Sequence, residues 1–150
     1  MRVVIQRVLQ ASVAVDQQVI STIQNGLLVF VGIETEDNES DVEWLGQKIV
    51  NMRIFPDDDQ LMNQSLLDIA GDLLLVSQFT LHASTKKGNR PSFTRAAKQE
   101  HAVKLYNQFA EKLSASLGKQ VKTGRFGADM KVSLMNDGPV TITMDSRSRE

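Results

Sequence analysis

The chain has 150 residues, of which 41% are hydrophobic and 23% charged, and its formal net charge is −1. A chain of this length buries roughly 70% of its unfolded surface on folding, so we expect residues 1–150 to form a single domain. The small net charge provides no bulk attraction to DNA, RNA or an anionic membrane. The absence of cysteine excludes a disulfide framework, a thiolate nucleophile and a cysteine-ligated zinc, and it fits a reducing cytoplasm.

The first part of the chain predicts three strands and a helix. RVVIQRV and ASVAVD are rich in β-branched residues, and QQVISTIQ follows a polar turn, which together predict an N-terminal meander. GLLVFVGIE is almost continuously apolar and predicts a strand covered on both faces. A helix is predicted after the possible caps Asn38 and Ser40. Its apolar positions are Val42, Leu45, Ile49 and Met52.

The second part predicts a buried strand, a longer helix and several C-terminal strands. DLLLVSQFTL is the strand, and the helix has an apolar stripe that ends at Gly118. KQVKTGRFG, MKVSLMN and PVTITM are separated by turn residues and predict further strands. The pattern indicates an α+β fold with many strands and two helices. No run approaches the ~20 apolar residues of a membrane span, so we expect neither export nor a membrane partner.

Motifs of cofactor and metal chemistry are missing. The sequence has no GxGxxG after a strand, no phosphate-binding GxxxxGKS and no HExxH, and its only histidines are His82 and His101. We therefore expect no cofactor and no metal. In a regular strand Thr80 and His82 would share a face, which makes a Thr-His nucleophile pair conceivable, although no third group to orient the base is evident.

Two polar stretches have both a structural and a functional interpretation. Ser77, Gln78 and Thr80 interrupt an apolar strand, either because the strand reaches solvent or because they line a site at its end. STKKGNRPSFTRAAK, residues 84–98, carries five cations within thirteen positions and is either a solvated face or a contact for RNA phosphates. These cations are Lys86, Lys87, Arg90, Arg95 and Lys98.

Gly138 and Pro139 stand directly before the alternating run from Val140 to Met144. A proline at the head of a strand is ordinarily punctuation, because that position does not need its missing N–H. Only about 5–6% of X–Pro bonds in folded proteins are cis, so the local sequence alone favours a trans turn.

Four ordered blocks resemble the D-aminoacyl-tRNA deacylase family. They are SQFTLHA, KKGNRPSF, GRFGADM and NDGPVTI, and the MRVVIQRV start belongs to the same resemblance. The resemblance implies a compact β-barrel-like domain of mostly antiparallel strands with two helices. It also implies a homodimer that hydrolyses the ester between tRNA and a D-amino acid, or glycine mischarged on tRNA(Ala), without a cofactor. DNA is not an expected partner.

The resemblance also assigns roles to individual residues. Ser77, Gln78, Phe79 and Thr80 are expected to line the reacting ester, with Phe126 and Met130 beside the terminal adenosine. Backbone N–H groups such as those of Gln78 and Phe79 are expected to stabilise the oxyanion. The ribose 2′-hydroxyl of the tRNA is expected to assist, and the chemical role of Thr80 stays open between nucleophile and wall.

Chiral selection is expected from Gly138 and Pro139, joined by a cis bond, held by Arg7 and inserted into the site of the partner subunit. Backbone carbonyls there would admit the α-hydrogen of a D residue and collide with an L side chain. Lys86, Lys87 and Arg90 are the expected tRNA contacts. Two rival hypotheses are a non-catalytic RNA-binding β module and a Thr-His esterase for small molecules.

Overall fold

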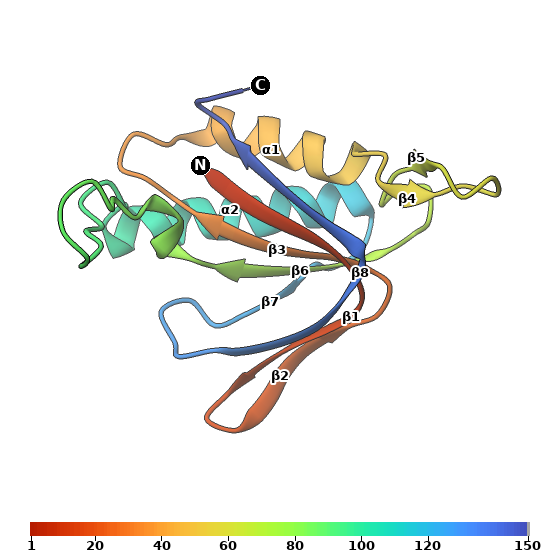
Figure 1. Cartoon of the computed structure of the whole chain (residues 1–150), viewed down its shortest axis with the longest axis horizontal. Coiled ribbons are helices and arrows are strands. Elements are labelled where there is room, and N and C mark those ends of the chain that lie inside the picture. Colours follow the sequence, from red (N-terminus) through yellow and green to blue (C-terminus); the bar gives the residue numbers. More distant parts are fainter. Residues whose placement is uncertain (150) are drawn as a thin grey trace.

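A strongly curved sheet is the central layer of the computed structural model, which describes residues 1–149 (Figure 1). Its strand order is β2-β1-β3-β6-β7, and β8 pairs with the other side of β1. The strands are β1 (Arg2–Val15), β2 (Gln18–Ile23), β3 (Gly26–Gly32), β6 (Asp72–Ser77), β7 (Lys122–Thr123) and β8 (Lys131–Asp145). β1 pairs antiparallel with β2, β3 and β8, whereas β3–β6 and β6–β7 are parallel. The sheet forms an incomplete barrel, as predicted.

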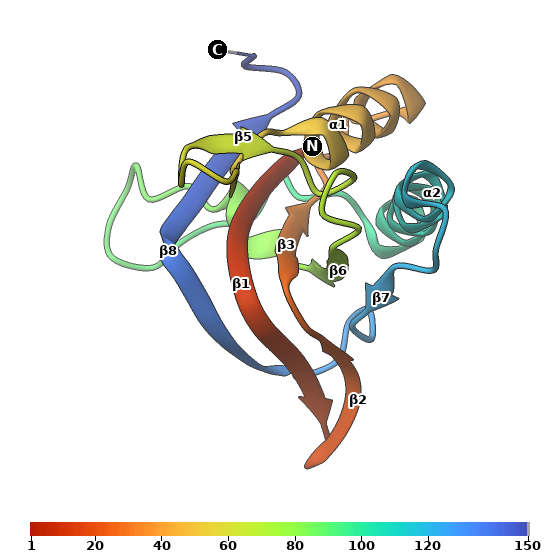
Figure 2. The ribbon, with the colours of Figure 1, turned by 90° about the vertical axis from the view of Figure 1, so that its right-hand side faces the viewer.

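Two helices lie side by side on one side of the sheet (Figure 2). They are α1 (Glu39–Asn51) and α2 (Gln99–Leu117). Asn38 caps α1 by accepting from the Ser40 N–H, and the Asp41 carboxylate accepts from the Asn38 N–H in return, which completes a capping box. Gly118 ends α2 with a φ of 65°, which glycine adopts at little steric cost. Both predicted helices are therefore confirmed.

The strands β3 and β6 are covered on both faces, as their apolar sequences predicted. Leu27 and Leu73 belong to the larger core between sheet and helices, while Leu28 and Leu74 belong to a second core enclosed by the curl of the sheet. Parallel strands require cover on both faces, because their crossover connections place other elements over the sheet. The curled sheet supplies that cover on the side opposite the helices.

The N-terminal strands merge into β1, which runs for 14 residues instead of forming two strands. Arg7 and Val8 are both buried and Leu9 and Gln10 both exposed, so the alternation of the strand shifts at this point. This irregularity coincides with a register shift against β8. A short hairpin of β4 (Phe55–Pro56) and β5 (Met62–Gln64) was not predicted.

Other strand predictions need correction. The expected strand 72–81 ends at Ser77, and Phe79–His82 form a 3-10 helix, η1, closed by the bond from the Leu81 N–H to the Gln78 carbonyl. KQVKTGRFG contributes only the two-residue β7. The two expected C-terminal strands form one strand, β8, because β1 pairs with it on both sides of the Gly-Pro pair. No helix within residues 1–149 is long and apolar enough to cross a membrane.

Candidate active site

A cavity of about 420 Å³ lies at the end of β6 and gathers segments that are distant in sequence. Ser77, Gln78 and Phe79 line one part of it, and Phe126 and Met130, from the segment before β8, line another. Ala97 and Gln99, at the start of α2, add lining residues that the sequence did not identify. Residues from SQFTLHA and GRFGADM therefore share one concave site of ordinary ligand-binding size.

The SQFT turn, which we define as Ser77 to Thr80, is fixed to the end of β3. The Gln78 N–H donates to the Val31 carbonyl at 2.7 Å, so it is not free to stabilise an oxyanion, and that part of the prediction is wrong. Within residues 1–149 neither the Phe79 N–H nor the Thr80 N–H has a hydrogen-bond acceptor. These two groups are the donors that the turn leaves for a substrate.

Gly32, the last residue of β3, allows the turn to lie this close. A Cβ placed on Gly32 would be 2.9 Å from the His82 Cδ2 and 3.0 Å from both the Gln78 carbonyl oxygen and the Leu81 Cβ. Carbon atoms in ordinary contact are about 3.5–4.0 Å apart. Any side chain at position 32 would therefore push against the SQFT turn and η1.

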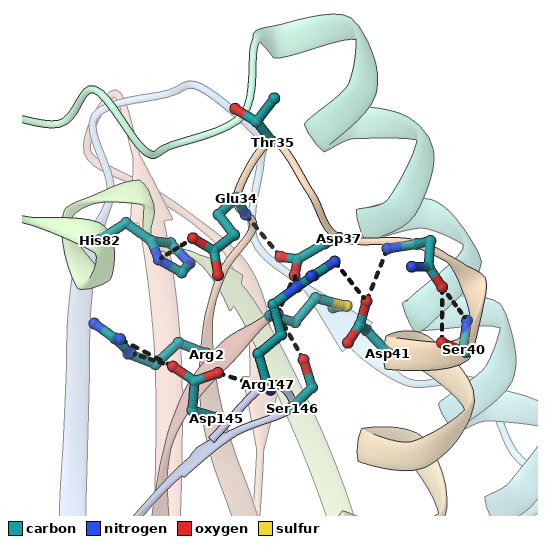
Figure 3. Close-up of polar contacts among 12 residues, drawn as sticks. Arg2, Glu34, Thr35, Asp37, Ser40, Asp41, His82, Asp145, Ser146 and Arg147 are labelled. Atoms are coloured by element: carbon teal, nitrogen blue, oxygen red, sulfur yellow. Dashed lines mark hydrogen bonds and ion pairs between the residues drawn. The ribbon is translucent and has the colours of Figure 1, made fainter. Parts of the chain in front are cut away.

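Thr80 and His82 do not form the conceivable nucleophile pair. Because η1 replaces the strand, Thr80 is exposed while the His82 side chain is fully buried, with no hydrogen-bond partner for either ring nitrogen in the part of the chain described. Thr80 Oγ1 accepts from the Gln78 side-chain amide instead. The His82 ring points toward the buried Glu34 carboxylate, 4.0 Å from its Nδ1 (Figure 3). His82 is not positioned to activate the Thr80 hydroxyl.

Aromatic and thioether side chains form the other wall of the cavity. The Phe126 ring meets the Tyr106 ring edge-on, with 5.5 Å between centroids. Tyr106 donates to the Leu75 carbonyl at 2.8 Å, and burial raises the pKa of its phenol well above the usual 10.0, so Tyr106 acts as a neutral donor. A Cβ on Gly124 would lie 2.5 Å from the Met130 sulfur, so Met130 occupies the space that this glycine leaves.

The Gly-Pro segment, residues 137–139, protrudes from β8. Along β1, Gln6 pairs with Thr141 and Val8 with Asn136, so two steps on β1 span five on β8. The Val140 N–H donates to the Asn136 side chain at 2.9 Å and closes this bulge. The peptide bond between Gly138 and Pro139 is cis, and both residues are exposed. The segment is absent from the lining of the cavity in its own chain.

Arg7 holds the Gly-Pro segment from beneath. Its side chain is 9% exposed, and its Nε lies 2.9 Å from Asp137 Oδ2 and 3.2 Å from the Asp137 carbonyl oxygen. Its Nη1 donates to the Ile54 carbonyl at 2.6 Å. This arrangement agrees with the expected contact between Arg7 and the segment.

The basic loop, residues 84–98, adjoins the site. Lys86, Lys87 and Arg90 are exposed and form no ion pair within the described part of the chain. The Phe93 ring packs edge-on against Phe79, with 5.0 Å between centroids, and so connects the loop to the SQFT turn. Arg95 forms an ion pair with Glu34. Glu34 lies in an acidic run of the sequence that gave no sign of this contact.

A separate network surrounds the first residue. The amino group of Met1 donates to Asp37 and Ser146, and Arg147 also contacts Asp37 (Figure 3). A larger cavity of about 920 Å³ lies between α1 and the end of β8, but none of the predicted site residues lines it. In residues 1–149 no group of three or more His, Asp or Glu side chains is arranged to hold a metal ion.

Comparison with solved structures identifies the class of fold. One solved protein, described as a c-Myc DNA unwinding element binding protein, is 41% identical and superimposes with a TM-score of 0.92 over 97% of this chain and 98% of its own. A second, described as a probable eukaryotic D-amino acid tRNA deacylase, has a TM-score of 0.84 over 95% of this chain and 97% of its own. At 17% identity the second similarity concerns the fold alone.

Sequence comparison identifies the family. Residues 4–145 match the family model described as D-Tyr-tRNA(Tyr) deacylase, and the chain belongs to that family. A protein of Christiangramia forsetii named D-aminoacyl-tRNA deacylase is 60% identical over 149 residues, 99% of each chain. One of Bacteroides fragilis with the same name is 59% identical over 150 residues, 100% of each chain. The family predicted from the four sequence blocks is confirmed.

Proposed function

We propose that the protein hydrolyses the ester bond of D-aminoacyl-tRNA and releases the D-amino acid and free tRNA. The observation that carries the proposal is the cavity that Ser77, Gln78 and Phe79 share with Phe126 and Met130, in a chain of this family. A cavity of about 420 Å³ falls within the ordinary range for small ligands. This size suits the aminoacylated 3′ end of a tRNA rather than a duplex. The whole chain works as one domain in this proposal.

The terminal adenosine binds against Phe126 and Met130. Aromatic faces stack on bases of single-stranded RNA, and such stacking is worth about 1–3 kcal/mol per base. The acyl group then extends toward the SQFT turn. The fixed backbone of the turn supports this orientation, because the bond to Val31 and the contact with Gly32 position its free N–H groups before the substrate arrives.

The reaction needs little from side chains. A water molecule attacks the acyl carbonyl carbon, the bond to the ribose 3′-oxygen breaks, and the proton lost by water is returned to that oxygen. The Phe79 and Thr80 N–H groups donate to the carbonyl oxygen as it becomes negative, and the adjacent 2′-hydroxyl assists the proton transfer. Removal of one such donor typically costs about 2.7–4 kcal/mol in other enzymes. Thr80, which is exposed and is not among the residues lining the cavity, contributes its backbone N–H and no nucleophile.

Chiral selection requires a second subunit in this proposal. The Gly-Pro segment is exposed and anchored by Arg7, which suits a backbone element that enters the site of a partner in a homodimer. There it leaves room for a hydrogen on the α-carbon but not for an L side chain. Glycine has no side chain that could collide with this filter. Glycyl-tRNA, including glycine mischarged on tRNA(Ala), is therefore also a substrate.

The basic loop contacts the tRNA, with Lys86, Lys87 and Arg90 as electrostatic contributors. Translation takes place in the cytoplasm, and we place the protein there. DNA is the second candidate ligand, because the 41% identical solved protein is described as binding a DNA element. A non-catalytic RNA-binding module remains the alternative to an enzyme.

Release of amino acid tests the proposal against these alternatives. The purified protein is incubated with D-tyrosyl-tRNA, and binding of deacylated tRNA and of single-stranded DNA of equal length is measured in parallel. Turnover of the ester with preference for tRNA supports the enzyme. Salt-dependent tRNA binding without ester turnover supports the binding module, and preferential binding of DNA without turnover supports the second ligand.

A further inference from the structure

Arg95 differs from the other cations of the basic loop because its side chain is held in place. Its Nε and Nη2 donate to Glu34 Oε2 at 3.0 and 2.6 Å. Its backbone carbonyl accepts from the Thr35 N–H at 3.1 Å. Lys86 and Arg90, in contrast, have no ion-pair partner in the described part of the chain.

The Glu34 carboxylate is an orienting group. Its side chain is 6% exposed, and its Oε1 is buried without a hydrogen-bond partner in residues 1–149. A buried carboxylate needs a cation, because desolvation without a partner is costly. The neighbouring His82 ring lies 4.0 Å away and Arg95 far closer, so the guanidinium is the principal partner.

The outer part of the Arg95 guanidinium remains available. The Arg95 side chain is 61% exposed, and only its Nε and Nη2 form hydrogen bonds within the described residues. A guanidinium has five N–H donors in a fixed plane and suits an anion with oxygen acceptors. The ion pair therefore presents its positive end to solvent and its negative end to the interior.

Arg95 also stands next to the candidate active site. Ala97, two residues later, lines the cavity, and the Ala97 N–H donates to the Ile33 carbonyl at 2.9 Å. Phe93, two residues earlier, packs against Phe79 of the SQFT turn. Arg95 is thus the fixed cation of the loop segment that borders the cavity.

We propose that Arg95, oriented by Glu34, binds a backbone phosphodiester of the tRNA close to its 3′ end. The inference rests on the proposed function, since it takes the tRNA terminus as the occupant of the cavity. A fixed side chain loses less conformational entropy on binding than the free lysines of the loop. Arg95 therefore contributes more to tRNA affinity than Lys86 or Lys87 does.

Salt dependence separates this role from a purely structural one. Each phosphate contact to a single strand contributes about 0.7 to the slope of log affinity against log salt concentration. One such contact therefore raises the affinity about fivefold at 0.1 M salt relative to 1 M salt. Glu34→Gln keeps an acceptor for Arg95 and removes the opposing negative charge. It is expected to preserve or increase tRNA affinity without lowering the slope.

The experiment measures binding of deacylated tRNA at several salt concentrations. Adding Arg95→Ala to Glu34→Gln avoids an unpaired buried charge, and is expected to weaken binding about fivefold at 0.1 M salt and reduce the slope by about 0.7. Lys48→Ala, toward the end of α1 remote from the basic loop in Figure 1, is the matched control and should change neither quantity. Glu34→Gln and the double variant should bind a tRNA that lacks its last three nucleotides with equal affinity.

Two results would overturn the inference. If Glu34→Gln and the double variant have equal slopes, the Glu34–Arg95 ion pair is structural only. The same conclusion follows if the two variants differ in affinity for the truncated tRNA as much as for the full-length tRNA. The fate of the proposed function is read separately, from hydrolysis of D-tyrosyl-tRNA by the unmodified protein. Hydrolysis together with equal slopes refutes the role of Arg95 alone. A reduced slope without hydrolysis refutes the proposed enzymatic function and supports the phosphate contact.

Discussion

Gly32→Ala is expected to displace the SQFT turn while leaving the fold intact. The added Cβ would meet the His82 ring and the Leu81 Cβ at 2.9 and 3.0 Å, about 0.5–1 Å inside ordinary contact. It would also meet the Gln78 carbonyl oxygen at 3.0 Å, which belongs to the backbone of the turn and cannot rotate away. Such overpacking typically costs about 1–3 kcal/mol. A displacement near 1 Å at the reacting groups is enough to lower a rate about 10²-fold.

Steady-state kinetics with D-tyrosyl-tRNA and a thermal melt measure both effects. We expect kcat to fall about 10²-fold with little change in KM, because the atoms nearest to the added Cβ belong to Gln78, Leu81 and His82 and not to Phe126, Met130 or the cations of the basic loop. Gly46→Ala in α1 is the matched control for overpacking away from the cavity, since the atoms nearest to its Cβ belong to the Lys112 side chain. The reasoning is refuted if Gly32→Ala retains both the kcat and the Tm of the unmodified protein.

Three further substitutions test other contacts. Thr80→Val should keep turnover within about tenfold, because the hydroxyl has no base beside it; a loss on the scale of 10³ or more would restore the nucleophile hypothesis. Arg7→Lys should lower the free energy of unfolding by about 1–3 kcal/mol and reduce the preference for D over L substrates, since Asp137 loses hydrogen bonds to a charged group. Chemical denaturation measures the loss of stability, and rates on the D and L esters measure the preference. An unchanged preference would count against the Gly-Pro filter. The hydrogen bond from Lys119 holds the pKa of Asp72 below its usual 3.8. The folded pKa is depressed, so this stabilisation is present above about pH 4 and lost as pH falls through the folded value. Asp72→Asn should therefore flatten the acid limb of stability against pH, and an identical limb in both proteins would contradict this assignment.

Local sequence signals were sufficient for the helices. Asn38 and Gly118 marked helix ends that the structure confirms, because capping depends on residues within a few positions. The apolar spacing of Val42, Leu45 and Ile49 likewise predicted the buried face of α1. Met52 instead lies at the C-cap, just beyond the helix.

Strand ends depended on partners that are distant in sequence. The strand 72–77 ends four residues early because its partner β3 ends at Gly32, and the glycine there admits the turn into η1. β8 continues past the Gly-Pro segment because β1 pairs with it on both sides. Neither interaction leaves a periodic signal in one sequence.

The composition of the site came from motif resemblance, and its geometry did not. SQFTLHA and GRFGADM indicated residues that the structure gathers around one cavity. The occupied N–H of Gln78 and the pair of Glu34 with Arg95, 61 positions apart, appear only when the chain is folded. A buried carboxylate such as that of Glu34 looks like any other acidic residue in the sequence.

Initial rates of ester hydrolysis on D-tyrosyl-tRNA and L-tyrosyl-tRNA, measured with the same protein sample, test the central claim most directly. The account predicts rapid release of D-tyrosine and release of L-tyrosine near the uncatalysed rate. Equal rates on the two esters would contradict the chiral filter, and no acceleration on the D ester would contradict the enzyme itself.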